Sequence, residues 1–318
     1  MADEDEQLRV RVAWLYFMEG LTQADIAGRL GITRLRANRL LGEARASGLV
    51  NIQVNARLAS CVALERELVA ATGLKDAVIV PTPDDAEQIP VVLGRAAADY
   101  LSRHLGEARV RGLGIGWGAT LRETVRHMAG ASLPQLSINS MMGGLTYGSE
   151  LNTFEIASEF ARRVNAQCHY LAAPIYAGSP KSRDTILAQD VFRDAFERLA
   201  ANDVALMSVG DLSRRSLLIR YGLPADVTVE SLRAAGAVGD IMGTFLDQRG
   251  EPVKHAVNRR VIALPIERLR KVDTAIVASG GLNKAAILAG VLRARLCNVL
   301  VSDESSARAA LGVLRGIG

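Results

Sequence analysis

Residues 109–121 read RVRGLGIGWGATL, an apolar run that leads into closely spaced glycines and then into the start of a helix. A short apolar run bounded by glycines and followed by a helical stretch is typical of a buried strand in an α/β fold. Glycines let main-chain N–H groups approach an oxyanion, and the N-terminus of the next helix favours negative charge. The stretch therefore predicts either an anion-binding loop or a tight strand-to-helix turn without a ligand.

Apolar runs of this kind alternate with helical stretches through most of the chain. Strands are expected at 77–80, 110–116, 136–142, 168–172, 203–209, 275–278 and 298–301. Helices are expected at 88–105, 119–129, 154–165, 186–200, 229–235, 266–271, 284–293 and 305–314. Strands that are apolar throughout are buried on both faces, so the alternation predicts an α/β domain whose mostly parallel sheet is covered by helices on both sides.

The candidate ligand-binding residues stand at the ends of these strands, because open parallel sheets bind ligands beyond the carboxyl ends of their strands. In the loop of 109–121, Gly118 lets main-chain amides approach an anion, and Thr120 adds a hydroxyl group. The loop lacks the Gly-Lys-Ser/Thr ending of a Walker motif. No acid follows about twenty residues later, as a dinucleotide site would require, so no nucleotide cofactor is expected.

Two further strand ends offer polar side chains. The segment INSMMGG at 138–144 places Asn139 within an apolar run before two glycines, and GAVGDIMGTFLD at 236–247 contains Asp240 and Asp247. Carboxylates accept hydrogen bonds from the hydroxyl groups of sugars. The alternative for each is a solvated polar residue, and for Asp247, which Gln-Arg-Gly follows, a turn is favoured.

The segment VASGGLNK at 277–284 ends a strand in paired glycines and places Lys284 at the opening of a helix. A cation there opposes the helix dipole unless an anion lies nearby. The chain has five lysines against thirty-three arginines, so a lysine at this position stands out. Its ammonium group is expected to bind a phosphate as a point charge. A Schiff base with a sugar carbonyl and an exposed lysine near a helix end are the alternatives.

The first fifty residues have a different pattern, in which short helical stretches are separated by glycines. A helix is expected at 7–18, a second helix begins after Thr22 and ends at Gly31, and a third runs from Thr33 to about residue 46. Two short helices joined across a glycine turn make a helix-turn-helix.

The candidate contacts to double-stranded DNA lie at the start of the second helix and along the third. Six arginines between Arg29 and Arg57 stand against one acid, Glu43, although the net charge of the whole chain is only +4. Arginine and asparagine can read base edges in the major groove through paired hydrogen bonds. The alternative is a solvated basic helix without a DNA-binding role. The candidate residues are Thr22, Gln23, Thr33, Arg34, Arg36, Asn38 and Arg39.

Composition excludes several classes of protein. An apolar fraction of 49% is enough for a large core and excludes wholesale disorder. Three widely separated cysteines and four histidines give no disulfide framework and no metal site by spacing, which is expected of a protein of the reducing cytoplasm. The acidic N-terminus and the lack of an apolar run of about eighteen residues argue against a signal peptide and a membrane span.

Three regions are expected along the chain. Residues 1–56 form the helix-turn-helix domain and include a short strand at 51–54. Residues 57–75 form a linker helix that either joins the two domains or pairs with its copy in a second subunit. Residues 76–318 form the α/β domain, which is expected to bind the ligand and to form the oligomer.

Four segments of the chain together resemble the SorC family of bacterial sugar-responsive transcriptional regulators, which is also grouped with DeoR-type regulators. They are LTQADIAGRLGITRLRANRLL at 21–41, GLGIGWGATL at 112–121, GAVGDIMGTFLDQRGEPV at 236–253 and VASGGLNKAAILAGVLRARLCNVLVSDESSA at 277–307. The resemblance covers almost the whole chain. It implies a winged-type or plain helix-turn-helix, followed by an effector domain similar in fold to glucosamine-6-phosphate deaminase and ribose-5-phosphate isomerase.

The resemblance also implies roles for particular residues. The family's phosphate loop falls on Gly116, Trp117, Gly118, Ala119 and Thr120. Its effector-contacting acid falls on Asp240, and its lysine after paired glycines falls on Lys284. Asn139 replaces what is often a glutamine or another polar residue, and the pair Met141 and Met142 departs from the more usual polar neighbours.

The resemblance implies a DNA-binding regulator of a carbohydrate or polyol operon that assembles as a homodimer or homotetramer and responds to a sugar or polyol phosphate. The main alternative is an enzyme, either an isomerase or deaminase of sugar phosphates or one that uses Lys284 in a Schiff base. The strand ends show no obvious cluster of acids and histidines for proton transfer, which disfavours the enzyme. A nucleotide-binding adaptor would need tight binding of NAD or ATP, against which the glycine pattern argues.

Overall fold

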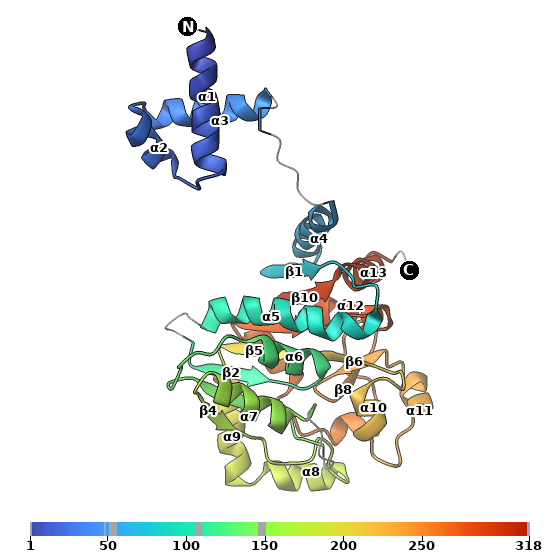
Figure 1. Ribbon diagram of the computed structural model, residues 1–318. Helices are drawn as coiled ribbons and strands as arrows, with labels where there is room; N and C mark the ends of the chain where they lie inside the picture. The colour runs from blue at the N-terminus through green and yellow to red at the C-terminus, as the bar shows by residue number, and fades with distance from the viewer. Residues whose placement is uncertain (1, 48, 51–55, 106–109, 146–150, 317–318) are drawn as a thin grey trace. The chain divides into compact units, whose positions relative to one another are not determined.

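The computed structural model describes residues 2–47, 49–50, 56–105, 110–145 and 151–316 (Figure 1). The chain divides into two compact units, Met1–Ala56 and Arg57–Gly318. The strand expected at 51–54 lies outside the described residues.

The first unit contains the helices α1 (Ala2–Phe17), α2 (Gln23–Leu30) and α3 (Arg34–Ala46). The Thr22 hydroxyl accepts a hydrogen bond from the Asp25 N–H, and the Asp25 carboxylate accepts one from the Thr22 N–H, which caps the start of α2. Gly31 ends α2 with a φ of 64°, which favours glycine. The predicted helix-turn-helix is therefore confirmed. The core between the helices contains Val12, Leu15, Ile26, Ala37, Leu40 and Leu41.

The second unit is built on a seven-stranded sheet in which every neighbouring pair of strands is parallel. Its strand order is β1-β10-β9-β5-β2-β3-β4. The prediction of a mostly parallel sheet is confirmed, and each of the seven strands expected in the α/β domain is present. The strands are β1 (Asp76–Val80), β2 (Gly112–Ile115), β3 (Ser137–Ser140), β4 (Gln167–His169), β5 (Val204–Met207), β9 (Thr274–Ala278) and β10 (Val299–Asp303).

The order of the strands creates a crevice near the centre of the sheet. The chain passes from β1 through β2 and β3 to β4 in one direction, and then returns through β5 and β9 to β10. Since crossovers between parallel strands are right-handed, the outward and return connections lie on opposite faces. The neighbouring strands β2 and β5 therefore send their chains to opposite faces, which is where α/β sheets bind ligands. The helices of the outward path are α5 (Ile89–Leu105), α6 (Ala119–His127) and α7 (Thr153–Arg163).

The helices of the return path differ in part from the expectation. The single helix expected at 186–200 is two helices, α8 (Pro180–Leu187) and α9 (Asp190–Ala200), because Gln189 is extended with a ψ of 142°. The segment Ile266–Lys271 is a 3₁₀ helix, and the helix expected at 284–293 is α12 (Ala285–Arg293). The last helix is α13 (Glu304–Leu314). In the part of the chain that the structure describes, no helix has the length and apolar character needed to cross a membrane.

A second, antiparallel sheet of three strands was not predicted. It has the order β6-β7-β8 and contains β6 (Val209–Asp211), β7 (Gly239–Ile241) and β8 (Thr244–Leu246). Each strand has three residues, and β6 follows β5 after Ser208 alone, so the sequence shows no separate apolar run. Met242 and Gly243 join β7 to β8 with positive φ angles of 49° and 77°, as a tight hairpin requires. The short helices α10 (Leu217–Tyr221) and α11 (Val229–Ala234) lie between β6 and β7 in the chain.

The helix expected to be a separate linker is part of the second unit. Helix α4 (Ala56–Thr72) buries Cys61, Leu64 and Leu68 in the core of that unit. The Glu65 carboxylate accepts a hydrogen bond of 2.8 Å from the main-chain N–H of Ile79 on the edge strand β1. Helix α4 therefore supplies an acceptor for a main-chain N–H that the edge strand would otherwise leave without a partner.

Candidate functional site

A cavity of about 740 Å³ lies at the carboxyl ends of five adjacent strands of the parallel sheet. The residues that line it follow β1, β2, β5 and β9 or end β10, so the cavity includes the crevice between β2 and β5. Segments distant in the sequence meet there, which is why spacing alone could not assemble the whole site. The lining residues from the ends of the parallel strands and from the antiparallel sheet include Thr82, Asp84, Trp117, Gly118, Ala119, Thr120, Ser208, Asp211, Asp240, Gly281, Lys284 and Asp303.

The loop after β2 presents the start of α6 to this cavity. Gly118 precedes the helix with a φ of 114°, a conformation that side chains other than that of glycine rarely adopt. Among the described residues, no side chain caps the start of α6, so the N–H groups of its first turn remain available to an anion. Trp117, Ala119 and Thr120 line the cavity beside Gly118. Gly116 does not line the cavity, and its N–H donates to the Leu206 carbonyl at 2.9 Å.

Asp240 lies on β7 with only 3% of its surface exposed, and it faces the same cavity. Its Oδ2 accepts a hydrogen bond of 3.0 Å from the N–H of Gly243 in the hairpin turn. Burial raises the pKa of Asp240 to about 6, against the opposing effects of this hydrogen bond and of Lys284. Gly210 is paired with Asp240 across the sheet, and a Cβ at Gly210 would overlap the carboxylate.

Lys284 precedes α12 and lines the cavity with Asp240. Its Nζ donates a hydrogen bond of 3.2 Å to the Ser279 hydroxyl. Burial lowers the pKa of Lys284, while the carboxylates of Asp211, Asp240 and Asp303 act in the opposite direction. The cavity therefore brings together an amine, a helix N-terminus and carboxylates, which can bind the anionic and hydroxyl groups of one ligand.

Asp303 is an important residue of this cavity that sequence reasoning missed. Its carboxylate accepts hydrogen bonds from the Gly281 N–H at 3.0 Å and from the Thr82 hydroxyl at 2.8 Å. A Cβ at Gly280 would overlap the same carboxylate. Asp303 thus holds the paired glycines next to Lys284 and joins them to the loop after β1. An aspartate between an apolar strand and a helix was the available signal, since Asp303 also caps α13.

Asn139 does not line this cavity. It is buried on β3, where its Nδ2 donates to the Oδ1 of Asn202 at 2.7 Å and its Oδ1 accepts from the Ser137 hydroxyl at 3.0 Å. The polar side chain within an apolar strand therefore pairs with a core partner, which disagrees with the prediction of a ligand contact. For Asp247, the turn is confirmed, because its Oδ1 accepts the N–H groups of Arg249 and Glu251.

In the first unit, the predicted DNA-contacting residues of α3 are all exposed. Arg34, Arg36, Asn38 and Arg39 are exposed, whereas Ala37 is fully buried. Gln23 donates a hydrogen bond of 3.3 Å to Asn38, Arg36 pairs with Asp5 at 2.9 Å, and Arg39 pairs with Glu43 at 3.5 Å. These contacts join exposed side chains and can be exchanged for contacts to phosphates and bases. Thr22 and Thr33 each accept a hydrogen bond from an N–H in the helix that follows.

Comparisons with known proteins agree with this architecture. Residues 56–312 match the family model described as "Putative sugar-binding domain". The erythritol catabolism regulatory protein EryD of Brucella abortus (strain 2308) is 28% identical over 317 residues, covering 99% of this chain and 100% of that protein. The transcriptional regulator LsrR of Enterobacter sp. (strain 638) is 31% identical over 318 residues, covering 98% of this chain and 95% of that protein.

A solved structure extends the match to the fold. The full-length sorbitol operon regulator SorC from Klebsiella pneumoniae superposes with a TM-score of 0.72 at 27% identity, covering 97% of this chain and 99% of that chain. These relatives are named as regulators, which removes the alternative of an isomerase, a deaminase or a Schiff-base enzyme. The chain belongs to the SorC family of sugar-responsive transcriptional regulators.

Proposed function

We propose that the cavity binds a phosphorylated sugar or polyol and that this ligand changes the affinity of the chain for an operator in double-stranded DNA. The observation that carries the proposal is the shared cavity of the uncapped start of α6, Lys284 and the buried Asp240. Helix N–H groups and an ammonium group suit a phosphate, and carboxylates suit the hydroxyl groups of a sugar or polyol. A single ligand that carries a phosphate and hydroxyl groups would therefore bind the start of α6, Lys284 and Asp240 at the same time.

The names of the relatives narrow the choice of ligands to test. EryD is named for erythritol catabolism and SorC for the sorbitol operon. Both compounds are polyols, whose hydroxyl groups match the carboxylates of the cavity. Erythritol, sorbitol and their monophosphates are therefore the first compounds to try.

The proposed DNA-binding surface is the exposed face of α3. Arg34, Arg36, Asn38 and Arg39 would contact bases and phosphates, while Thr22 and Gln23 at the start of α2 and Thr33 at the start of α3 would contact the backbone. A single helix-turn-helix reads a short site, so we infer that a homodimer or homotetramer presents paired heads to two half-sites. A ligand that binds one arrangement of the heads more tightly shifts the balance between bound and released states by about 1 to 3 kcal/mol.

A thermal-shift screen tests the ligand. We expect the monophosphates to stabilise the wild-type protein and the free polyols to stabilise it much less, because only the former occupy the anion-binding groups. Replacing Lys284 with Gln should weaken binding of a monophosphate by about tenfold or more, since a charge-assisted hydrogen bond contributes about 1.5 to 3 kcal/mol. The matched control is Lys181→Gln on α8, outside the cavity. Equal stabilisation by both forms of each polyol would contradict the proposed phosphate contact.

A mobility-shift assay tests the DNA-binding surface. Arg36→Ala should weaken binding to the operator without changing affinity for a polyol phosphate. The control is Arg29→Ala, which removes an exposed arginine of α2 that is paired with Glu19 at 3.0 Å. If Arg29→Ala weakens operator binding as much as Arg36→Ala does, the loss reflects charge alone and the assigned surface is wrong.

A further inference from the structure

The segment 212–227, between β6 and α11, covers part of the cavity. It contains α10 and contributes lining residues that no strand end supplies. Leu218 fixes the middle of the segment in the core, whereas the side chains of Arg215, Arg220 and Tyr221 are exposed. The lining residues from this segment are Arg215, Ser216, Leu217, Leu218, Arg220 and Tyr221.

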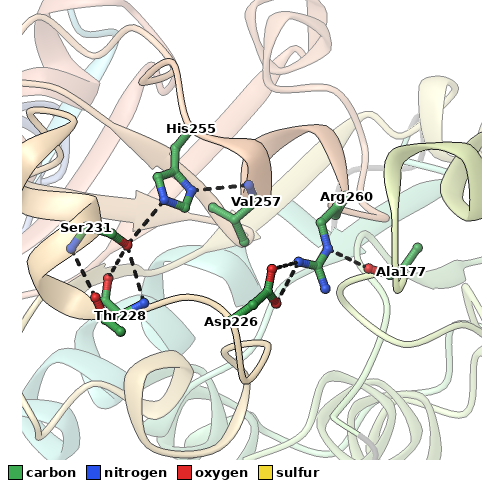
Figure 2. A network of polar contacts seen from close by, with 7 residues as sticks. All are labelled: Ala177, Asp226, Thr228, Ser231, His255, Val257 and Arg260. Atoms are coloured by element: carbon green, nitrogen blue, oxygen red, sulfur yellow. Dashed lines mark hydrogen bonds and ion pairs between the residues drawn. The ribbon is translucent and has the colours of Figure 1, made fainter.

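The two ends of the segment are held in different ways. At its start, the Asp211 carboxylate accepts the N–H of Ser213 at 3.1 Å, and Arg233 donates to the Leu212 carbonyl at 3.4 Å. Near its end, one guanidinium nitrogen of Arg260 bonds both carboxylate oxygens of Asp226, at 2.8 and 2.9 Å (Figure 2). The start is therefore joined directly to the small sheet, while the end is held by this ion pair and by the buried side chain of Val227.

The arginine of this pair is itself firmly held. The Nε of Arg260 donates to the Ala177 carbonyl at 2.8 Å (Figure 2). The N–H of Ala177 also donates to the Arg260 carbonyl, at 2.9 Å. Arg260 has 10% of its side chain exposed, whereas Asp226 has 69%. Arg260 lowers the pKa of Asp226 through this hydrogen bond. The pair thus joins an exposed loop carboxylate to a fixed, buried cation, and Asp226 is the partner that can move away.

The segment that holds Arg260 in place is also connected by hydrogen bonds to a residue that lines the cavity. Tyr176, next to Ala177, donates a hydrogen bond of 2.5 Å to the Gly243 carbonyl. The N–H of the same Gly243 donates to Asp240. The group that holds the segment and the carboxylate that faces the ligand are therefore parts of one hydrogen-bonded framework.

Arg215 gives the segment a chemical role. Within the described residues its guanidinium has no ion-pair partner, although it lines a cavity with an anion-binding helix N-terminus. An arginine with its donors unused can bond a phosphate through two parallel hydrogen bonds. Arg215 therefore offers an anion-binding group from the segment that lines this side of the cavity.

We propose that residues 212–227 form a lid over the cavity, that the Arg260–Asp226 pair holds it closed, and that Arg215 contacts the bound anion from the lid. The identity of the anion rests on the proposed function, whereas the tether, which is the Arg260–Asp226 pair, does not depend on it. Asp226 and Arg260 are positioning residues, because they act on the ligand only through the lid.

Hydrogen–deuterium exchange of the full chain tests the tether without a ligand. In Asp226→Asn, the main-chain amides of 212–227 should exchange about threefold faster, because the loss of one exposed ion pair has only a small effect on local stability. Exchange of the amides in the parallel sheet should not change. The matched control is Asp184→Asn. Asp184 is 71% exposed and pairs at 3.0 Å with Arg183, whose Nε also donates to a main-chain carbonyl, but it lies on α8 outside the lid. Equal exchange of 212–227 in the two variants would overturn the tether.

Exchange with sorbitol phosphate or erythritol phosphate present tests the lid and its arginine. Either compound, where it raises the melting temperature, should slow exchange of 212–227 in the wild type. The protection should be smaller in Arg215→Gln. Binding that leaves exchange of the lid unchanged would overturn the lid while the proposed function stands. If neither compound binds, the proposed function fails, and the comparison of Asp226→Asn with Asp184→Asn still decides the tether.

Discussion

At the scale of single residues, the cavity depends on charged groups that are costly to bury. Asp240 and Lys284 face one space, and burial shifts both of their pKa values toward the neutral forms. The sequence indicated both residues because each follows an apolar strand and lies beside glycines. Asp303 had the available signal of an aspartate between an apolar strand and a helix. Nothing in the sequence indicated Arg215, because its role depends on contacts between segments distant in the chain. The structure places Asn139 outside the cavity, and its partner, Asn202, lies 63 positions away in the chain, so the contact could not be predicted from the sequence.

The raised pKa of Asp240, about 6, predicts that anion binding depends on pH. As the pH rises through this value, the carboxyl group gains negative charge and opposes an anion in the same cavity. Lys284, Asp211 and the N–H of Gly243 act on the pKa of Asp240, and the buried hydroxyl of Tyr176 also lies within its electrostatic reach. We expect affinity for sulfate, which keeps its charge, to fall several-fold from about pH 5 to about pH 7.

Isothermal titration calorimetry with sulfate measures this change. Asp240→Asn keeps the shape of the side chain and removes its titration, so its affinity for sulfate should vary less with pH. A pH dependence that is the same in Asp240→Asn and in the wild type would assign the effect to other groups, such as Lys284.

At the scale of elements, apolar content identified the parallel strands, most clearly β2, β5 and β10, whose residues are all buried. The antiparallel sheet β6-β7-β8 escaped prediction because its strands have three residues each. The break between α8 and α9 was not predicted either, because the residue at the break is Gln189 and not a glycine or a proline. Helix α4 was predicted as a helix, but its packing on the edge strand β1 is a tertiary contact that its sequence alone does not define.

The contact between α4 and β1 predicts a difference between two substitutions of Glu65. Glu65→Ala leaves the half-buried N–H of Ile79 without its acceptor and should lower the free energy of unfolding by about 1 to 3 kcal/mol. Glu65→Gln retains an amide oxygen in the same place and should cost much less. Thermal unfolding of the two variants compares these effects. An equal loss of stability in both would show that the charge matters and not the acceptor.

At the scale of the whole molecule, the proposed regulation requires two heads to bind one operator. Recognition helices related by two-fold symmetry contact half-sites separated by about 34 Å, one turn of DNA. Adding about five base pairs between the half-sites would turn one of them to the opposite face of the DNA, and adding about ten would restore the alignment. We expect operator affinity to fall with the first insertion and to recover in part with the second. Equal affinity for both spacings would argue that the heads bind independently.

The central claim is that an anionic ligand at Gly118 and Lys284 changes how the heads bind DNA, and fluorescence anisotropy tests it most directly. Operator DNA is titrated with wild type and with Lys284→Gln, each with and without the polyol phosphate that stabilises the wild type most. We predict that the ligand changes the operator affinity of the wild type by about fivefold or more. Lys284→Gln should bind DNA equally well without ligand and lose most of this response. An equal response to the ligand in both proteins would contradict the claim.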